Sequence, residues 1–189
     1  MHTRTHYIAA AVWMSGALLA GTAHAVEYTQ VQPQASKITF DYQQMGVGMQ
    51  GKFNAFQGRL RFDPAQPQQA QATLVVDLAS VDVDSDEAND ELATQTWFNT
   101  PAFPQAQFVS TSVKALGAGQ YEVTGQLTIK GQSQKVVVPA RFTEKAGQGI
   151  FTGKLTIQRG AFSIGEGAWK AFDIVANDVV VNFHLTVAP

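Results

Sequence analysis

Apolar and polar side chains alternate along most of the chain, with the period of two that is typical of half-buried β-strands. The alternation is clearest in YEVTGQLTIKG (121–131) and FTGKLTIQR (151–159). It recurs less regularly in 37–42, 71–78, 106–114, 136–142 and 179–187. Turn residues separate these segments. The pattern predicts an all-β domain of eight or nine strands, which favours an antiparallel barrel over a sandwich.

One segment, VGMQGKFNAFQGRLRF (47–62), changes phase in its middle. Apolar or small residues occupy odd positions up to Phe53 and even positions from Phe56 onward. A shift of one residue moves every side chain to the other face of a sheet, so a bulge or bend near Asn54 is required to restore the register. Such a bend helps to close a sheet, and we predict an extended eight-stranded antiparallel barrel.

A single helix is predicted over DSDEANDELATQ (84–95), where Asp84 and Glu87 have the spacing of a capping pair. It leads into WFNTPAFPQAQF (97–108), whose two prolines argue against a continuous helix. This aromatic loop has two interpretations. It closes the core at one barrel end, or it gates an apolar cavity there. The same two interpretations apply to Trp169. The gate residues would be Trp97, Phe98 and Phe103, and we expect Phe108 and Trp169 among the residues that contact a ligand.

The first 25 residues have the features of a secretory signal peptide. Arg4 supplies the positive charge, Ile8 to Gly21 is largely apolar, and Ala23-His24-Ala25 is an A-x-A cleavage site. Cleavage after Ala25 leaves residues 26–189 as one exported domain, and we expect it in the periplasm.

Composition excludes several kinds of chemistry. Without Arg4 the mature chain carries 12 basic and 15 acidic side chains, which argues against nucleic-acid binding. It has no cysteine and one histidine, His184, so thiol catalysis and Ser-His-Asp chemistry lack the residues they need. We therefore predict a protein that is not an enzyme, with no metal site and no required cofactor.

Small residues on the apolar faces suggest room inside the barrel. Gly125 and Gly153 interrupt otherwise large apolar positions, and glycine in a strand marks either a close approach or a bulge. An eight-stranded barrel fills itself with side chains or holds one small ligand. We predict a ligand cavity whose walls are formed by Phe40, Leu74, Val76, Leu127, Leu155 and Phe183.

Arg159 continues the inward parity of Leu155 and Ile157. A buried arginine needs partners. It is either a structural group bound to an acid or to loop carbonyls, or a polar anchor for a ligand head group.

Several of these blocks, in this order, resemble the YceI-like family. They are GKFNAFQGRLRFDP (51–64), DLASVDVDSDEANDEL (77–92), WFNTPAFPQAQFVST (97–111), YEVTGQLTIKGQSQKVVVP (121–139) and IQRGAFSIG (157–165). The resemblance covers essentially the whole mature chain. Family members often have His-Leu where this chain has Glu91-Leu92, and often an acid before the Phe-Gly step where this chain has Ala161-Phe162-Ser163.

The resemblance implies a lipocalin-like, exported barrel that binds polyisoprenoid or other long-chain lipids. It also implies a cytochrome b561-like membrane protein as a partner and an isoprenoid quinone as cargo. The sequence leaves open whether the chain is a monomer or a homodimer. At about 0.3 kcal/mol per heavy atom, a chain of about 30 to 40 atoms would gain about 9 to 12 kcal/mol from apolar contact. The alternative is a protein-interaction or stress-response barrel with a filled interior and no lipid cargo.

Overall fold

The computed structural model describes residues 26–189, so the predicted signal peptide and its cleavage site lie outside the described residues. In that range the chain forms eleven strands and one α-helix, α1 (Asp86–Ala93). The strands are β1 (Tyr28–Val31), β2 (Lys37–Gln44), β3 (Val47–Phe53), β4 (Phe56–Phe62), β5 (Gln71–Asp77), β6 (Val81–Asp82), β7 (Gln105–Gly117), β8 (Gln120–Ile129), β9 (Gln132–Lys145), β10 (Gln148–Gln158) and β11 (Asp178–Ala188).

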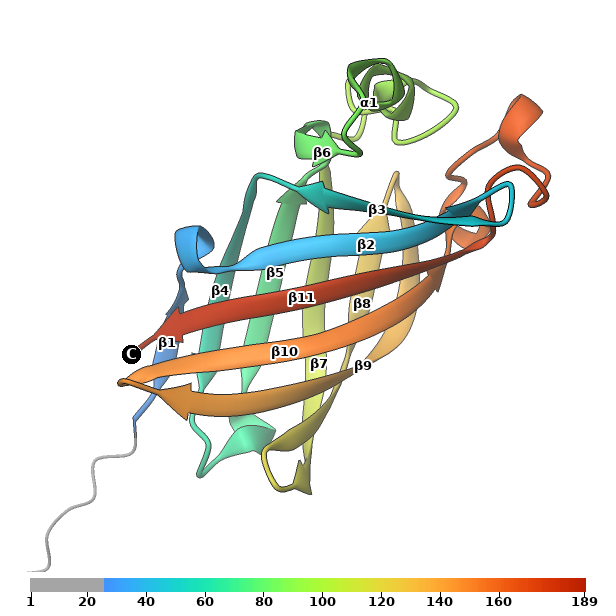
Figure 1. Ribbon diagram of the computed structural model, residues 1–189. Coiled ribbons are helices and arrows are strands. Elements are labelled where there is room, and N and C mark those ends of the chain that lie inside the picture. Colours follow the sequence, from blue (N-terminus) through green and yellow to red (C-terminus); the bar gives the residue numbers. More distant parts are fainter. Residues whose placement is uncertain (1–25) are drawn as a thin grey trace, which may run out of the picture.

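The sheet closes on itself as a barrel (Figure 1). Its strands follow the order β1-β4-β5-β7-β8-β9-β10-β11, and β11 pairs back with β1. These eight strands form an antiparallel ring, which confirms the predicted barrel. The pair β2–β3 continues the sheet from β11, and β6 adds two residues beyond β3.

The predicted bend lies between β3 and β4. β3 ends at Phe53 and pairs with β2, whereas β4 begins at Phe56 and pairs with β1 and β5. Across the bend, the Asn54 amide donates to the Ser80 carbonyl over 3.0 Å. The inward-facing residues are at odd positions in β3 and at even positions in β4. The turn of the chain at the bend compensates for this shift, so the apolar side chains of both strands face the barrel interior.

The apolar side chains of the barrel gather in two clusters. The larger cluster lies toward α1 and contains Phe40, Leu78, Val81, Trp97, Phe98, Ala106, Ile129, Ile157, Phe162, Ile164 and Val175. The smaller is centred on Tyr28 and Phe62, with the rings of Tyr121, Phe142 and Phe151 around Phe62 at centroid distances of 4.9 to 5.4 Å.

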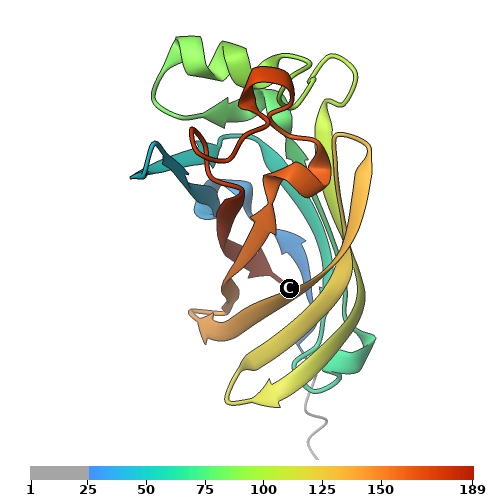
Figure 2. The same cartoon turned by 90° about the vertical axis from the view of Figure 1, so that its right-hand side faces the viewer.

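Helix α1 and the irregular segment 159–177 lie at the same end of the barrel (Figure 2). The helix is shorter than the predicted 84–95 span, and Ser85 caps it by accepting a hydrogen bond from the Ala88 amide. Asp84 is not the cap, since it adopts a left-handed conformation with φ of 58° one residue earlier. No helix within residues 26–189 is long and apolar enough to cross a membrane.

Candidate functional site

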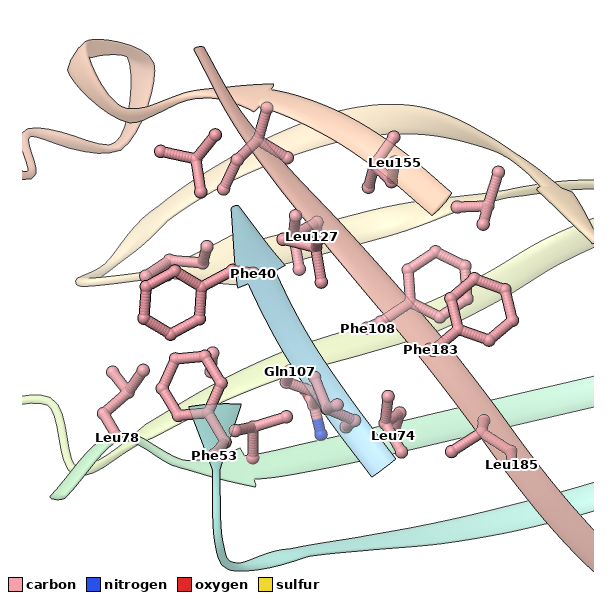
Figure 3. Close-up of a pocket in the computed structure, with 18 of the residues that line it drawn as sticks. Phe40, Phe53, Leu74, Leu78, Gln107, Phe108, Leu127, Leu155, Phe183 and Leu185 are labelled. Carbon is pink, nitrogen blue, oxygen red and sulfur yellow. The ribbon is translucent and has the colours of Figure 1, made fainter. Parts of the chain in front are cut away.

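An apolar cavity of about 370 Å³ occupies the interior of the barrel (Figure 3). Its wall is built by the inward faces of the strands, with the side chains of Phe40, Leu127 and Leu155 pointing into the space. Eleven of the twelve residues predicted to contact a ligand line it: Phe40, Leu74, Val76, Trp97, Phe98, Phe108, Leu127, Leu155, Arg159, Trp169 and Phe183.

The burial of the wall residues shows that this space is hollow. Leu74, Leu127 and Leu155 point inward, yet each keeps part of its surface accessible. Leucines in a filled core are almost completely buried because neighbouring side chains cover them. The alternative of a filled interior therefore does not describe this barrel, although the Phe62 cluster does fill one end of it.

The volume sets a scale for what fits. A cavity of about 150 Å³ accommodates a benzene ring of six carbons. By that proportion, the space of about 370 Å³ takes about 15 carbon atoms, or about three isoprene units. This is shorter than the chain of about 30 to 40 atoms considered from the sequence.

The two inward glycines are covered by aromatic rings. A Cβ on Gly125 would lie 2.5 Å from the Phe108 ring, and a Cβ on Gly153 would lie 2.5 Å from the ring of Phe183. Phe183 is the register partner of Gly153 on β11. A Cβ would also meet backbone carbonyl oxygens, that of Val109 at 2.5 Å from Gly125 and that of Pro139 at 2.3 Å from Gly153. Both glycines thus allow rings and backbone to approach closely, and the rings occupy space that the sequence assigned to a ligand.

The aromatic loop divides into parts with different surroundings. Trp97 and Phe98 are buried and line the cavity. Phe103 does not line it, because its ring packs on Gly131 at the turn between β8 and β9. Of the residues predicted for the gate, Phe103 is therefore the one that the cavity wall does not include.

Glu91 joins the two tryptophans within residues 26–189. The indole N–H groups of Trp97 and Trp169 both donate to Glu91 Oε1, over 3.2 Å and 3.1 Å. The two rings lie 5.5 Å apart between centroids, and all three side chains line the cavity. The last turn of α1, the aromatic loop and the 167–169 turn are thereby tied together over one end of the barrel.

Arg159 holds the segment that follows it. Its side chain is 2% exposed and donates to six carbonyl oxygens, those of Ile164, Gly165, Trp169, Ala171, Val175 and Ala176. Burial lowers the pKa of Arg159, but a guanidinium stays charged in proteins. All its N–H groups are used by the chain, so Arg159 is a structural group. The chain thus occupies the donors that a head-group anchor would need.

Lys130 is a second buried cation at this end, and sequence reasoning missed it. Its Nζ donates to Ser163 O over 2.6 Å and to Glu166 Oε2 over 2.9 Å. The strand pattern placed Lys130 on the outer face, but the residue begins the β8–β9 turn with φ of 48°, which redirects its side chain.

The lining is otherwise poor in charge. Arg59, Glu91 and Arg159 are the charged residues that line the cavity. Arg59 is exposed and alternates with the inward-facing Gly58 and Leu60. Burial raises the pKa of Tyr42, whose phenol is therefore neutral. Within residues 26–189 no group of three or more acidic or histidine side chains could hold a metal ion.

Comparison with known proteins identifies the family of this chain. The sequence model of the YceI-like domain matches residues 29–187. The chain belongs to the YceI-like family. A UPF0312 protein of Yersinia enterocolitica is 36% identical over 138 residues, which cover 71% of this chain and 70% of that protein. A UPF0312 protein of Ectopseudomonas mendocina is 33% identical over 135 residues, covering 70% and 71%.

Solved structures share the YceI-like barrel. The crystal structure of Burkholderia cenocepacia BcnA is similar with a TM-score of 0.81 and 39% identity, covering 82% of this chain and 98% of that one. A polyisoprenoid-binding domain from Saccharophagus degradans has a TM-score of 0.68 and 19% identity, covering 87% and 99%. At 19% identity, the similarity to the Saccharophagus degradans domain shows that the two proteins share a fold.

Proposed function

We propose that this YceI-like protein is a binding protein for an isoprenoid or other long-chain lipid, whose tail occupies the barrel cavity. The observation that carries the proposal is the cavity itself, about 370 Å³ of space with almost entirely apolar walls. Empty apolar space costs stability, and a hydrocarbon tail is the ligand that such a surface binds best. The polyisoprenoid-binding domain from Saccharophagus degradans, which has the same fold, supports this choice of ligand.

The proposal also covers the identity of the lipid and the location of the protein in the cell. An isoprenoid quinone has the apolar tail that the cavity requires, and its head group would lie toward the end at Trp97 and Trp169. The signal peptide predicted over residues 1–25 supports a periplasmic carrier. The cytochrome b561-like partner, which the family resemblance implies, and the homodimer stay predictions.

A cavity-blocking variant tests the proposal. Mature protein is titrated with a quinone that carries a three-unit isoprenoid tail, and binding is measured as the rise in Tm and by native mass spectrometry. Ligand that binds only the folded state raises Tm in proportion to the logarithm of its concentration. Leu155→Trp places a large ring in the cavity and should weaken binding at least tenfold.

The matched control is Val137→Trp on the outer face of β9, where Val137 is 47% exposed. It adds the same ring outside the barrel and should leave binding unchanged. Equal binding by both variants, or no binding by the unmodified protein, would contradict the proposal.

A further inference from the structure

The acid that lines the cavity, Glu91, is a polar group that the chain does not saturate. Glu91 Oε1 accepts both indole hydrogen bonds, whereas no hydrogen bond or ion pair within residues 26–189 engages its Oε2. A carboxylate has about four lone-pair sites. Glu91 therefore keeps acceptor capacity at the cavity surface.

No ion pair within residues 26–189 joins Glu91 to a cation, and the two buried cations at this end keep no donor free for a ligand. The donors of Arg159 are used by six carbonyls. Lys130 binds Glu166 and two carbonyls and does not line the cavity. A phosphate brought to this end would therefore find no free cationic donor, and it would meet a carboxylate of like charge, which repels it.

Resting on the proposed function, we infer that the polar end of the cargo lies at Glu91 and carries a hydrogen-bond donor, a hydroxyl or an amine. Isoprenoids that end in a phosphate or diphosphate are discriminated against by the same carboxylate. A hydrogen bond to an ionised acceptor is stronger than one between neutral groups. Apolar contact retains the tail, and Glu91 selects the head group.

The inference also separates the two redox forms of a quinone. The carbonyl oxygens of the oxidised form only accept hydrogen bonds, so they offer nothing to a carboxylate. The hydroxyl groups of the reduced quinol can donate to Glu91 Oε2. Measured without oxygen, the quinol should bind at least threefold more tightly than the quinone with the same tail, and equal or reversed affinities would count against the inference.

The chain provides a local reporter for the main test. Trp97 and Trp169 are the two tryptophans within residues 26–189, and both donate to Glu91. Tryptophan emission of the mature protein therefore reports on this end of the cavity. Farnesol, farnesylamine and farnesyl phosphate share one tail, and each is titrated against the protein by emission and by the rise in Tm.

We expect the alcohol and the amine to bind at least tenfold more tightly than the phosphate. Glu91→Gln keeps an oxygen that can accept from the indoles but removes the charge, and it should reduce this ratio to less than threefold. Glu87→Gln makes the same charge change on the exposed side of α1 and should preserve the ratio. Glu91→Asp, which keeps the charge, serves as a second variant.

The outcomes separate the two claims. If none of the three compounds binds, the proposed lipid-binding function is overturned. If all three bind equally, or the phosphate binds most tightly, lipid binding stands and the role of Glu91 is overturned. The ratio in the unmodified protein decides this even if the Glu91 variants do not fold.

Discussion

The ring of Phe40 lies across Gly51, its register partner on the adjacent strand, so closely that a Cβ on the glycine would fall 2.3 Å from Phe40 Cζ. The three nearest atoms to that Cβ all belong to the Phe40 ring. Gly51→Ala should push the ring toward the cavity and cost about 1 to 3 kcal/mol of stability. The measurement is Tm by calorimetry, where a loss of several degrees is expected.

A second glycine on β3 provides the control. A Cβ on Gly48 would meet nothing within 4 Å, so Gly48→Ala should leave Tm within about one degree. Adding Phe40→Leu to Gly51→Ala should cost less than the sum of the two single changes, because the clash is then removed. Strict additivity would contradict the close approach.

Arg159→Lys tests the structural role of the buried guanidinium. A lysine has three N–H donors in place of the planar fork that serves six carbonyls. Hydrogen bonds to charged groups contribute about 1.5 to 3 kcal/mol each, so we expect a loss of about 3 kcal/mol or more in the free energy of unfolding, measured with urea. Arg141→Lys, on the exposed face of β9, is the control. Unchanged stability with altered ligand selectivity would restore Arg159 as a ligand anchor.

The affinity for a prenyl alcohol should depend on the length of its tail. Each added isoprene unit contributes five heavy atoms, or about 1.5 kcal/mol, which is about tenfold in affinity. Because the cavity takes about three units, prenyl alcohols should gain about tenfold per unit up to the third and less than threefold per unit beyond it. Competition against a fluorescent lipid measures this. Tenfold gains continuing to eight units would show that the cavity extends past the Phe62 cluster.

The hydrogen bonds of the Asp41 carboxylate should stabilise the protein at neutral pH but not in acid. The amide of Gln50 donates to the Asp41 carboxylate over 3.0 Å and that of Asn182 over 2.7 Å, which together hold the pKa of this carboxyl below its ordinary value. A carboxyl whose pKa is lowered in the folded state stabilises the protein at pH values above its pKa in the unfolded chain, which is about 3.9. That stabilisation is lost as the pH falls through the folded pKa. The difference in Tm between the unmodified protein and Asp41→Asn should therefore shrink below about pH 4, and a constant difference would contradict this.

Sequence periodicity predicted the barrel and most of the cavity wall because alternation determines which side chains share a face. It was weakest where the backbone departs from regular pairing. The segment 106–114 looked irregular because the β7–β8 register shifts between Ser110 and Ser112, which moves the inward face from Phe108 to Val113. The bend at Asn54 was found because it changes the parity of a long run.

The polar groups at the cavity end could not be predicted in the same way. Glu91 lies 78 residues before Trp169, and Lys130 lies 36 residues before Glu166. Contacts of that separation depend on how the loops fold over the barrel, which no local pattern encodes. The sequence signals available were an acid in the last turn of α1 and a lysine before a glycine turn.

The most direct test of the central claim is native mass spectrometry of the mature protein isolated from its own cells without detergent. The account predicts one lipid per chain, released by organic solvent and identified as an isoprenoid with a hydroxyl or amine head group. Leu155→Trp isolated in the same way should carry much less of it. A chain that emerges free of lipid, and that takes up none when isoprenoid alcohols are added, would contradict the account.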